Sequence, residues 1–205
     1  VFSDLNDLTS HGPVELGGTI QTAGNQSYLG TATLIAATEI QAAGGSFEGG
    51  LVGAGNDLTL NIASTITTSG AQSFEGNATL IGNTTLVGPS ATLAGTFDGQ
   101  GHDLTIDYTS PTTISSSGGN ISNFTSVGDV LLNTTDFETI GSQTFEGNVT
   151  LTGDTMLTGT SGSFANGLDG DGHSLTLNYF NTTTIDGNSV FSDLNDLTSH
   201  GPVEL

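Results

Sequence analysis

The chain contains the same sixteen residues twice, and this repetition limits its architecture more than any other feature. Val1 to Leu16 reads VFSDLNDLTSHGPVEL, and Val190 to Leu205 is identical in every place, so the offset is 190 − 1 = 189 positions. A fixed period is typical of repeat architectures. We therefore predict that residues 1–189 are one full repeat and that residues 190–205 begin the next, in a segment of a tandem array of near-identical copies.

Shorter repeats lie inside the long one. Three segments share a hydrophobic residue followed by Gly-x-Gln-Ser/Thr-aromatic-x-Gly: Ile20–Ile40, Ile66–Leu86 and Phe137–Leu157. Each leads into a second frame that ends in LTLN or LTID. The equivalent glutamines, Gln26, Gln72 and Gln143, are separated by 72 − 26 = 46 and 143 − 72 = 71 positions. These spacings indicate units of roughly 23 to 24 residues and about eight units in each period, a length typical of solenoids.

Hydrophobic residues alternate with Thr, Asn and Asp at the ends of these frames, as in Leu58-Thr-Leu60. A period of two predicts strands with one buried face, and the Gly, Asn, Asp and Pro clusters between them predict turns. A unit this short cannot bury its apolar face alone, so we expect parallel stacking into a right-handed parallel β-helix with almost no α-helix. Eight coils at ~4.8 Å each would advance about 38 Å per period. A barrel or a sandwich is the alternative, although neither accepts unlimited tandem copies.

Equivalent hydrophobic residues of the three segments are predicted to form ladders down the interior of this solenoid. In the columns Phe47/Leu93/Phe164 and Leu51/Phe97/Leu168, Phe and Leu trade places in the middle segment, which conserves volume in a packed core. The predicted ladders are Ile20/Ile66/Phe137, Tyr28/Phe74/Phe145, Leu34/Leu80/Leu151, Phe47/Leu93/Phe164, Leu51/Phe97/Leu168, Leu58/Leu104/Leu175 and Leu60/Ile106/Leu177. The glutamine positions and the Asn or Asp positions after the Leu-Thr-Leu pattern are interpreted as structural, and we predict that they form side-chain hydrogen-bond ladders.

The composition excludes several functions. The 205 residues include no Lys, Arg or Cys, against 21 Asp and Glu. Without cations the chain is not expected to bind nucleic acid or an anionic membrane unaided, and without Cys it forms no disulfide. No apolar run approaches the ~20 residues of a membrane-spanning helix. We expect residues 1–205 to form a single continuous solenoid segment.

The repeats resemble a known family. The run ITTSGAQSFEGNATLIGNTTL, the LTLN strand after a Gly-rich corner and the coil VFSDLNDLTSHG are similar to repeats of filamentous haemagglutinin-like adhesins and related giant bacterial surface exoproteins. The resemblance covers essentially the whole chain. It implies a secreted β-helical shaft, exported by an outer-membrane partner or a comparable route. The export and tip domains of that family have no counterpart in these residues.

Two Gly-rich loops are candidate metal sites. Asp98-Gly-Gln-Gly-His102 and Asp169-Gly-Asp-Gly-His173 superficially resemble a calcium loop, with Asp98, Asp169 and Asp171 as the candidate ligands. An EF-hand loop also needs later oxygen ligands and a bidentate Glu, and neither follows here. Turn formation is therefore the main interpretation, and loosely bound surface Ca²⁺ is the alternative. No other cofactor is expected.

The pattern does not favour an enzyme. The four histidines are His11, His102, His173 and His200, and no Ser lies in a Gly-x-Ser-x-Gly elbow. Polysaccharide lyases share the β-helix, but their mechanism uses a basic residue that this chain lacks. Eight Asn-x-Ser/Thr triplets make glycosylation a hypothesis that an intact mass would test. These triplets begin at Asn25, Asn77, Asn83, Asn120, Asn123, Asn133, Asn148 and Asn181.

The sequence as a whole predicts a non-enzymatic, extracellular or cell-surface shaft. Its partners are expected to be neighbouring repeats of the same chain, with end-to-end or lateral self-association into fibres. The alternative is a binding module whose acidic, Thr/Asn-rich face holds cations, glycans or a partner cell surface. The unpaired carboxylates predict that stability rises with salt, since stacked coils bring like charges together.

Overall fold

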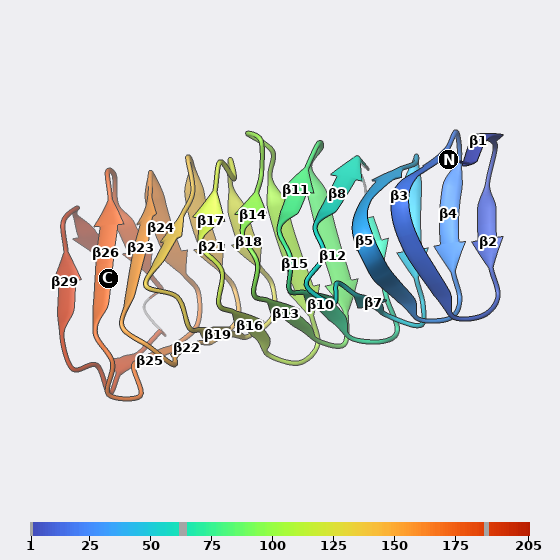
Figure 1. Cartoon of the computed structure of the whole chain (residues 1–205). Coiled ribbons are helices and arrows are strands. Elements are labelled where there is room, and N and C mark those ends of the chain that lie inside the picture. Colours follow the sequence, from blue (N-terminus) through green and yellow to red (C-terminus); the bar gives the residue numbers. More distant parts are fainter. Residues whose placement is uncertain (1, 62–64, 187–188) are drawn as a thin grey trace.

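The computed structural model describes residues 2–61, 65–186 and 189–205, which form one elongated parallel β-solenoid (Figure 1). Every element in these ranges is a β-strand, and every strand pairing between them is parallel. The predicted all-β solenoid class is therefore confirmed. The chain winds in about ten turns, with its N-terminal strands at one end of the rod and its C-terminal strands at the other.

The strands lie on three faces, which the chain visits in a fixed order. The first face is an 11-stranded sheet: β2 (Leu8–Ser10), β4 (Asn25–Tyr28), β6 (Gly44–Phe47), β9 (Thr65–Thr67), β12 (Thr84–Gly88), β15 (Leu104–Tyr108), β18 (Phe124–Ser126), β21 (Ser142–Phe145), β24 (Ser161–Phe164), β27 (Thr183–Ile185) and β30 (Val203–Glu204). The second face holds β7 (Leu51–Val52), β10 (Gln72–Phe74), β13 (Ala91–Leu93), β16 (Thr112–Ile114), β19 (Val130–Leu132), β22 (Val149–Leu151), β25 (Leu168–Asp169) and β28 (Phe191–Ser192).

The third face begins with β1 (Phe2–Leu5), β8 (Leu58–Asn61), β11 (Ala78–Leu80), β14 (Phe97–Asp98) and β17 (Gly118–Gly119). It continues as a four-stranded sheet of β20 (Asp136–Glu138), β23 (Thr155–Gly159), β26 (Leu175–Tyr179) and β29 (Leu197–Ser199). Two long strands, β3 (Val14–Thr22) and β5 (Ala32–Gln41), run from the second face onto the third. These two strands join both faces into one 15-stranded sheet.

Each coil is shorter than the spacing of the glutamines indicates. On the first face, Leu8 pairs with Gln26, Gln26 with Gly45 and Gly45 with Ile66, which are steps of 18, 19 and 21 positions. The predicted eight coils, each of roughly 23 to 24 residues, are therefore corrected to about ten coils of about 20. The physical reason is that Gln26 and Gln143 lie on the first face whereas Gln72 lies on the second. Gln72 is thus not separated from Gln26 or from Gln143 by a whole number of turns.

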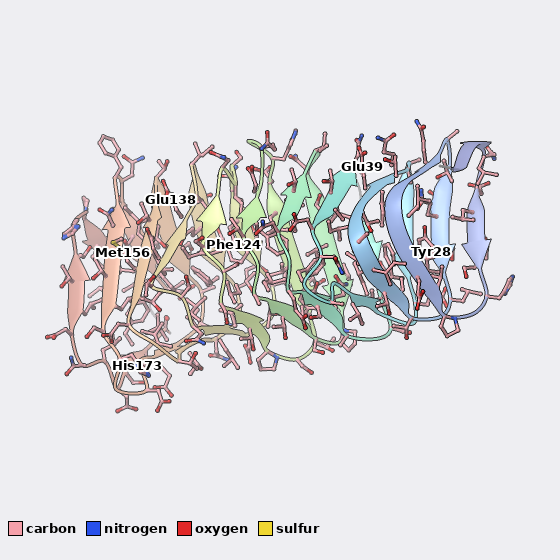
Figure 2. The ribbon with its side chains drawn as sticks, in the orientation of Figure 1. Tyr28, Glu39, Phe124, Glu138, Met156 and His173 are labelled. Atoms are coloured by element: carbon pink, nitrogen blue, oxygen red, sulfur yellow. The ribbon has the colours of Figure 1, made fainter. Side chains whose placement is uncertain are left out.

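Hydrophobic columns fill the interior. On the third face Ile20 pairs with Ile40, Ile40 with Leu60 and Leu60 with Leu80, and all four side chains are buried. Such stacking of like residues removes apolar surface from water at every coil. A series of phenylalanine rings also lies inside, with centroids 4.9 Å apart for Phe124 and Phe137 and 5.1 Å apart for Phe145 and Phe164 (Figure 2 labels Phe124).

The residues predicted for the seven ladders are all buried, but the ladders themselves are wrong. In each ladder the first and third members share a face, and the middle member lies one face further round. The middle members on the first face are Ile66, Leu104 and Ile106, those on the second are Phe74 and Leu93, and those on the third are Leu80 and Phe97. The first and third members are Ile20/Phe137, Leu58/Leu175 and Leu60/Leu177 on the third face, Tyr28/Phe145 and Phe47/Phe164 on the first, and Leu34/Leu151 and Leu51/Leu168 on the second.

The columns instead join residues about one coil apart in the sequence. The predicted ladder Leu60/Ile106/Leu177 shows the difference, since none of these three side chains pairs with another of them. Leu60 pairs with Ile40 and Leu80, whereas Ile106 pairs with Leu86 and Ser126, and Leu177 pairs with Leu157 and Ser199. The three segments therefore repeat the same inside-and-outside pattern without stacking on one another.

Candidate functional site

The two predicted calcium loops form tight turns at corners of the solenoid. In the first, Gln100 and Gly101 have φ of 49° and 82°, and the His102 N–H donates to the Gly99 carbonyl at 2.8 Å. In the second, Asp171 and Gly172 have φ of 44° and 79°, and the His173 N–H donates to Gly170 at 2.7 Å. Two central residues with positive φ and this hydrogen bond define a type I′ turn, for which Gly, Asn and Asp are preferred.

The candidate ligands serve these turns. Asp98 Oδ1 accepts hydrogen bonds from the Gln100 N–H at 3.1 Å and from Asn120 Nδ2 at 3.2 Å, and Oδ2 accepts from Gln100 Nε2 at 2.6 Å. Partial burial acts to raise the pKa of Asp98, but these hydrogen bonds outweigh it and hold the pKa below its ordinary value. Asp169 Oδ1 accepts from the Asp171 N–H at 3.0 Å.

The loops do not converge on one site. Asp98 ends β14 on the third face, whereas Asp169 ends β25 on the second face several coils away. Within residues 2–61, 65–186 and 189–205 no group of three or more His, Asp or Glu side chains is arranged to hold a metal ion. The geometry of these carboxylates is explained by turn formation, and calcium binding stays a prediction.

The histidines lie apart from one another. His173 projects from the lower edge of the rod in Figure 2, with Nδ1 3.8 Å from Asp154 Oδ1. His200 Nδ1 lies 3.2 Å from Asn178 Oδ1 on the exposed side of β26. His11 is exposed at the opposite end of the rod, and His102 belongs to the first type I′ turn. His173 and His200 thus make local polar contacts at separate corners.

Asn and Asp side chains form ladders along the corners. The sequence reasoning predicted Asn/Asp ladders only at the positions after Leu-Thr-Leu and missed these corner positions. At the corner before the first face, Asn83 Oδ1 accepts from the Asp103 N–H, and Asp103 Oδ1 from the Asn123 N–H, each at 3.0 Å. Asn123 Oδ1 then accepts from the Ser142 N–H at 2.9 Å. Asp57 and Asn77 begin the same arrangement before the third face, and Asp129 and Asn148 before the second. Each rung satisfies a backbone N–H where the chain turns out of the sheet.

These ladders explain many of the glycosylation triplets. All eight asparagines are exposed, but several of them stand at a corner, one residue before a buried strand position. Asn123 precedes buried Phe124, and Thr125 points outward in the alternation of the strand. A corner Asn, an inward residue and an outward Thr together spell Asn-x-Thr. The signal for this ladder was therefore present in the sequence, although glycosylation itself stays a hypothesis.

The three glutamines are buried, and each is paired with a tyrosine. Tyr108 donates its hydroxyl to Gln72 Oε1 at 2.9 Å, and Tyr179 donates to Gln143 Oε1 at 2.7 Å, both from 36 residues further along the chain. Gln143 Nε2 in turn donates to the Phe137 and Thr158 carbonyls. Gln26 pairs instead with Tyr28 on its own strand, at 2.7 Å. Burial raises the pKa of Tyr28 to about 12 and that of Tyr179 well above its ordinary value, so these hydroxyls stay protonated donors.

A small residue in the intervening coil makes room for the longer pairs. Gly162 pairs with Gln143 in the strand register, and a Cβ on it would lie 2.3 Å from a ring carbon of Tyr179. Ala91 holds the same place next to Gln72. The polar pairs therefore tie together coils that are not neighbours, and they satisfy an amide that would be costly to bury alone.

The hydrophobic interior is open along the axis at both ends of the rod. At the N-terminal end, Leu8, Val14, Leu16, Ile20 and Tyr28 line an apolar hollow. At the C-terminal end, Leu197 is 49% exposed and Val203 is 43% exposed. Leu197 and Val203 are the second copies of Leu8 and Val14. The same short sequence thus forms the terminal coil at each end.

No family model, curated protein or solved structure matches the chain. Among the described residues there is no helix of the length and apolarity needed to cross a membrane.

Proposed function

We propose that the protein is a non-enzymatic structural shaft, the repeated body of an extracellular fibre or a giant cell-surface adhesin. One observation carries this proposal: identical residues form the coil at both ends of a single solenoid, and each copy leaves hydrophobic surface open along the axis. A further repeat of the same chain supplies the coil that covers this surface. The resemblance of the repeats to filamentous haemagglutinin-like adhesins supports the same role.

The contacts along the axis suit a stiff rod. Neighbouring coils are joined by parallel strands on three faces, and buried columns such as Ile20, Ile40, Leu60 and Leu80 run between them. The corner ladders add a hydrogen bond between coils where the sheets are interrupted. Length and rigidity are therefore the properties that this arrangement supplies. A chain without Lys or Arg also offers trypsin no cleavage site, which fits an extracellular location.

Electron microscopy of purified arrays tests the proposal. Proteins of one, three and six repeats should appear as rods of constant width. Each repeat should add about 46 Å, because the 29 strand positions of one period, three to a coil, make just under ten coils that rise ~4.8 Å each. Compact particles, or rods whose length does not increase with repeat number, would show that the repeats do not form a shaft.

Lateral association of shafts into fibres is part of this proposal, and one observation favours it. Ile140 is 62% exposed and Phe180 is 87% exposed. Both lie on the same edge of the solenoid, since Thr160 between them hydrogen-bonds to the Ile140 carbonyl and accepts from the Asn181 N–H. Lateral association of shafts along this edge would cover them. Sedimentation of Ile140→Ser/Phe180→Ser and native arrays tests this, because equal sedimentation would exclude lateral association through the edge.

The alternative function is a binding module, and glycan arrays test the predicted glycan partners.

A further inference from the structure

The two copies of the sixteen-residue segment occupy different faces of the solenoid. In the N-terminal copy, β1 lies on the third face, β2 on the first, and Val14–Leu16 of β3 on the second. In the C-terminal copy the same residues form β28 on the second face, β29 on the third and β30 on the first. Every strand of the second copy is therefore displaced by one face from its place in the first.

A strand count gives the same result. From β1 to β28 the chain advances 29 strand positions, because β3 and β5 each occupy two faces. With three faces to a turn, these positions make nine full turns and two further strands. One 189-residue period therefore ends one face short of ten turns.

Each copy also shows one side of the seam between repeats. The C-terminal copy shows the preceding coil, in which Thr176 pairs with Thr198, the equivalent of Thr9. The N-terminal copy shows the following coil, in which Thr9 pairs with Ser27. In an array, Thr198 and Thr9 are the same residue. This residue pairs on one side with Thr176, on the third face of the preceding repeat, and on the other side with Ser27, on the first face of its own repeat. The strand pairing is continuous through the seam.

One sequence pattern can fold on more than one face of this solenoid. A repeat that begins on a different face from the repeat before it is therefore compatible with the fold. The segment that contains Gln72 repeats the pattern of those that contain Gln26 and Gln143, yet it lies one face further round. Gln72 and Gln143 nevertheless make the same contact, a hydrogen bond from a tyrosine 36 residues later. The chain thus already folds one sequence frame in two positions around its axis.

We propose that successive 189-residue repeats stack end to end with a displacement of one face. The occupant of each open end is a second copy of the repeat, and a surface feature returns to the same face only at every third repeat. Exposed groups such as Phe180 and the turn at Asp171 are then presented in three directions around the shaft. This inference rests on the proposed shaft and adds the register in which its repeats join.

Cysteine pairs test the register, because the chain has no cysteine of its own. In a protein of two full repeats followed by residues 1–16, Thr9 of the second repeat is replaced by Cys together with Thr176 of the first, T176C/T9C. The matched control is T184C/T9C, since Thr184 on β27 is the partner expected if Thr9 kept its place on the first face across the seam. A third variant, T9C/S27C within the second repeat, tests the pairing of Thr9 with the coil that follows the seam. All these side chains point outward or lie half-buried, and paired Cα atoms ~4.8 Å apart are within disulfide range.

The displaced seam predicts that T176C/T9C and T9C/S27C oxidise to an internal disulfide, at about tenfold or greater yield than T184C/T9C. Intact mass and mapping with a protease specific for acidic residues give the yields, after circular dichroism has shown that the reduced variants keep β-structure. A disulfide in T184C/T9C in place of T176C/T9C would overturn the displacement and leave the shaft intact. No disulfide in any variant would overturn both.

Discussion

At the residue scale, the buried glutamine amides set the most demanding contacts in the interior. Gln143 is fully buried, and its Oε1 receives the hydroxyl of Tyr179 from two coils away. A buried carbonyl that loses its donor costs more than one hydrogen bond contributes, because it cannot turn to water instead. The pair therefore fixes the spacing of three successive coils as well as the rotamers of its two members.

Replacing Tyr179 by Phe should lower the free energy of unfolding by about 1–3 kcal/mol, since it leaves Gln143 Oε1 without a donor. The neighbouring Phe180→Ala, at an 87% exposed position, is the control and should change it by about 0.5 kcal/mol or less. Urea unfolding monitored by circular dichroism gives both values. Equal effects of the two substitutions would contradict the role assigned to the pair.

Asp98 should make part of the stability depend on pH. Its pKa is lower in the folded chain than the ordinary value of 3.8, so its contribution is present above that value and is lost as the pH falls through the lowered pKa. Between about pH 4 and pH 2, Asp98→Asn should therefore lose less stability than the native chain. Asp107→Asn, which removes an exposed carboxylate on β15, controls for net charge. Parallel pH profiles for the native chain and Asp98→Asn would refute this assignment.

Sequence reasoning found the glutamines but not their partners. Gln26, Gln72 and Gln143 stand out because they occupy equivalent places in three segments. Tyr108 and Tyr179 also occupy equivalent places, but a contact across 36 residues can be deduced only when the coil length is known. The predicted coil length of roughly 23 to 24 residues was too long, so the tyrosines could not be placed over the glutamines.

At the element scale, side-chain hydrogen bonds connect successive coils at the corners, as backbone pairing connects them in the sheets. The ladder from Asn83 through Asp103 and Asn123 to Ser142 connects four successive coils by side-chain acceptors. An Asp and an Asn are equivalent in this ladder, because only Oδ1 is needed to accept from the next N–H. In this ladder the Asp103 carboxylate lies between the Asn83 and Asn123 amides, so its neighbours at the corner are uncharged.

Asp103→Asn and Asp103→Ala separate the acceptor from the charge. The Asn variant keeps Oδ1 and should unfold with the native free energy or slightly above it, since a negative charge is removed. The Ala variant loses the acceptor for the Asn123 N–H and should be less stable by about 0.5–1.5 kcal/mol. Chemical denaturation of the two variants measures the difference. Destabilisation by Asn as large as that by Ala would mean that the charge, and not the acceptor, matters at this corner.

Strand positions were predicted well, and their grouping was not. Alternation at Leu58, Leu104 and Leu175 correctly indicated inward side chains, because period two is a local property of the chain. The choice of face is not local, since it depends on how many residues each intervening corner contains. Corners here vary from a single residue at Thr160 to the five of Gly99–Asp103, and aligned segments consequently fall on different faces.

At the scale of the whole molecule, net charge is the dominant long-range term. The formal charge of −21 is concentrated on a narrow rod, and corner hydrogen bonds do not neutralise it. Raising NaCl from about 0.01 M to about 0.5 M shortens the screening length several-fold and should raise the melting temperature. Differential scanning calorimetry gives this value, with sucrose as the uncharged control. A melting temperature that does not depend on salt would contradict this view of the surface.

The solenoid class could be predicted from the sequence because tandem identity and period-two patterning leave few alternatives. The number of coils in each repeat could not be predicted, since it requires the register that links Leu8 to Gln26 and Gln26 to Gly45. The difference is measurable: eight coils give an axial repeat of about 38 Å, and 29 strand positions on three faces give about 46 Å.

X-ray diffraction from an oriented sample of a multi-repeat array tests the central claim, that successive coils stack in parallel along one axis. We expect a strong meridional reflection near ~4.8 Å together with an axial spacing of about 46 Å per repeat. A pattern without the meridional reflection near ~4.8 Å, or with that spacing across the fibre axis, would contradict the stacked solenoid and the shaft built from it.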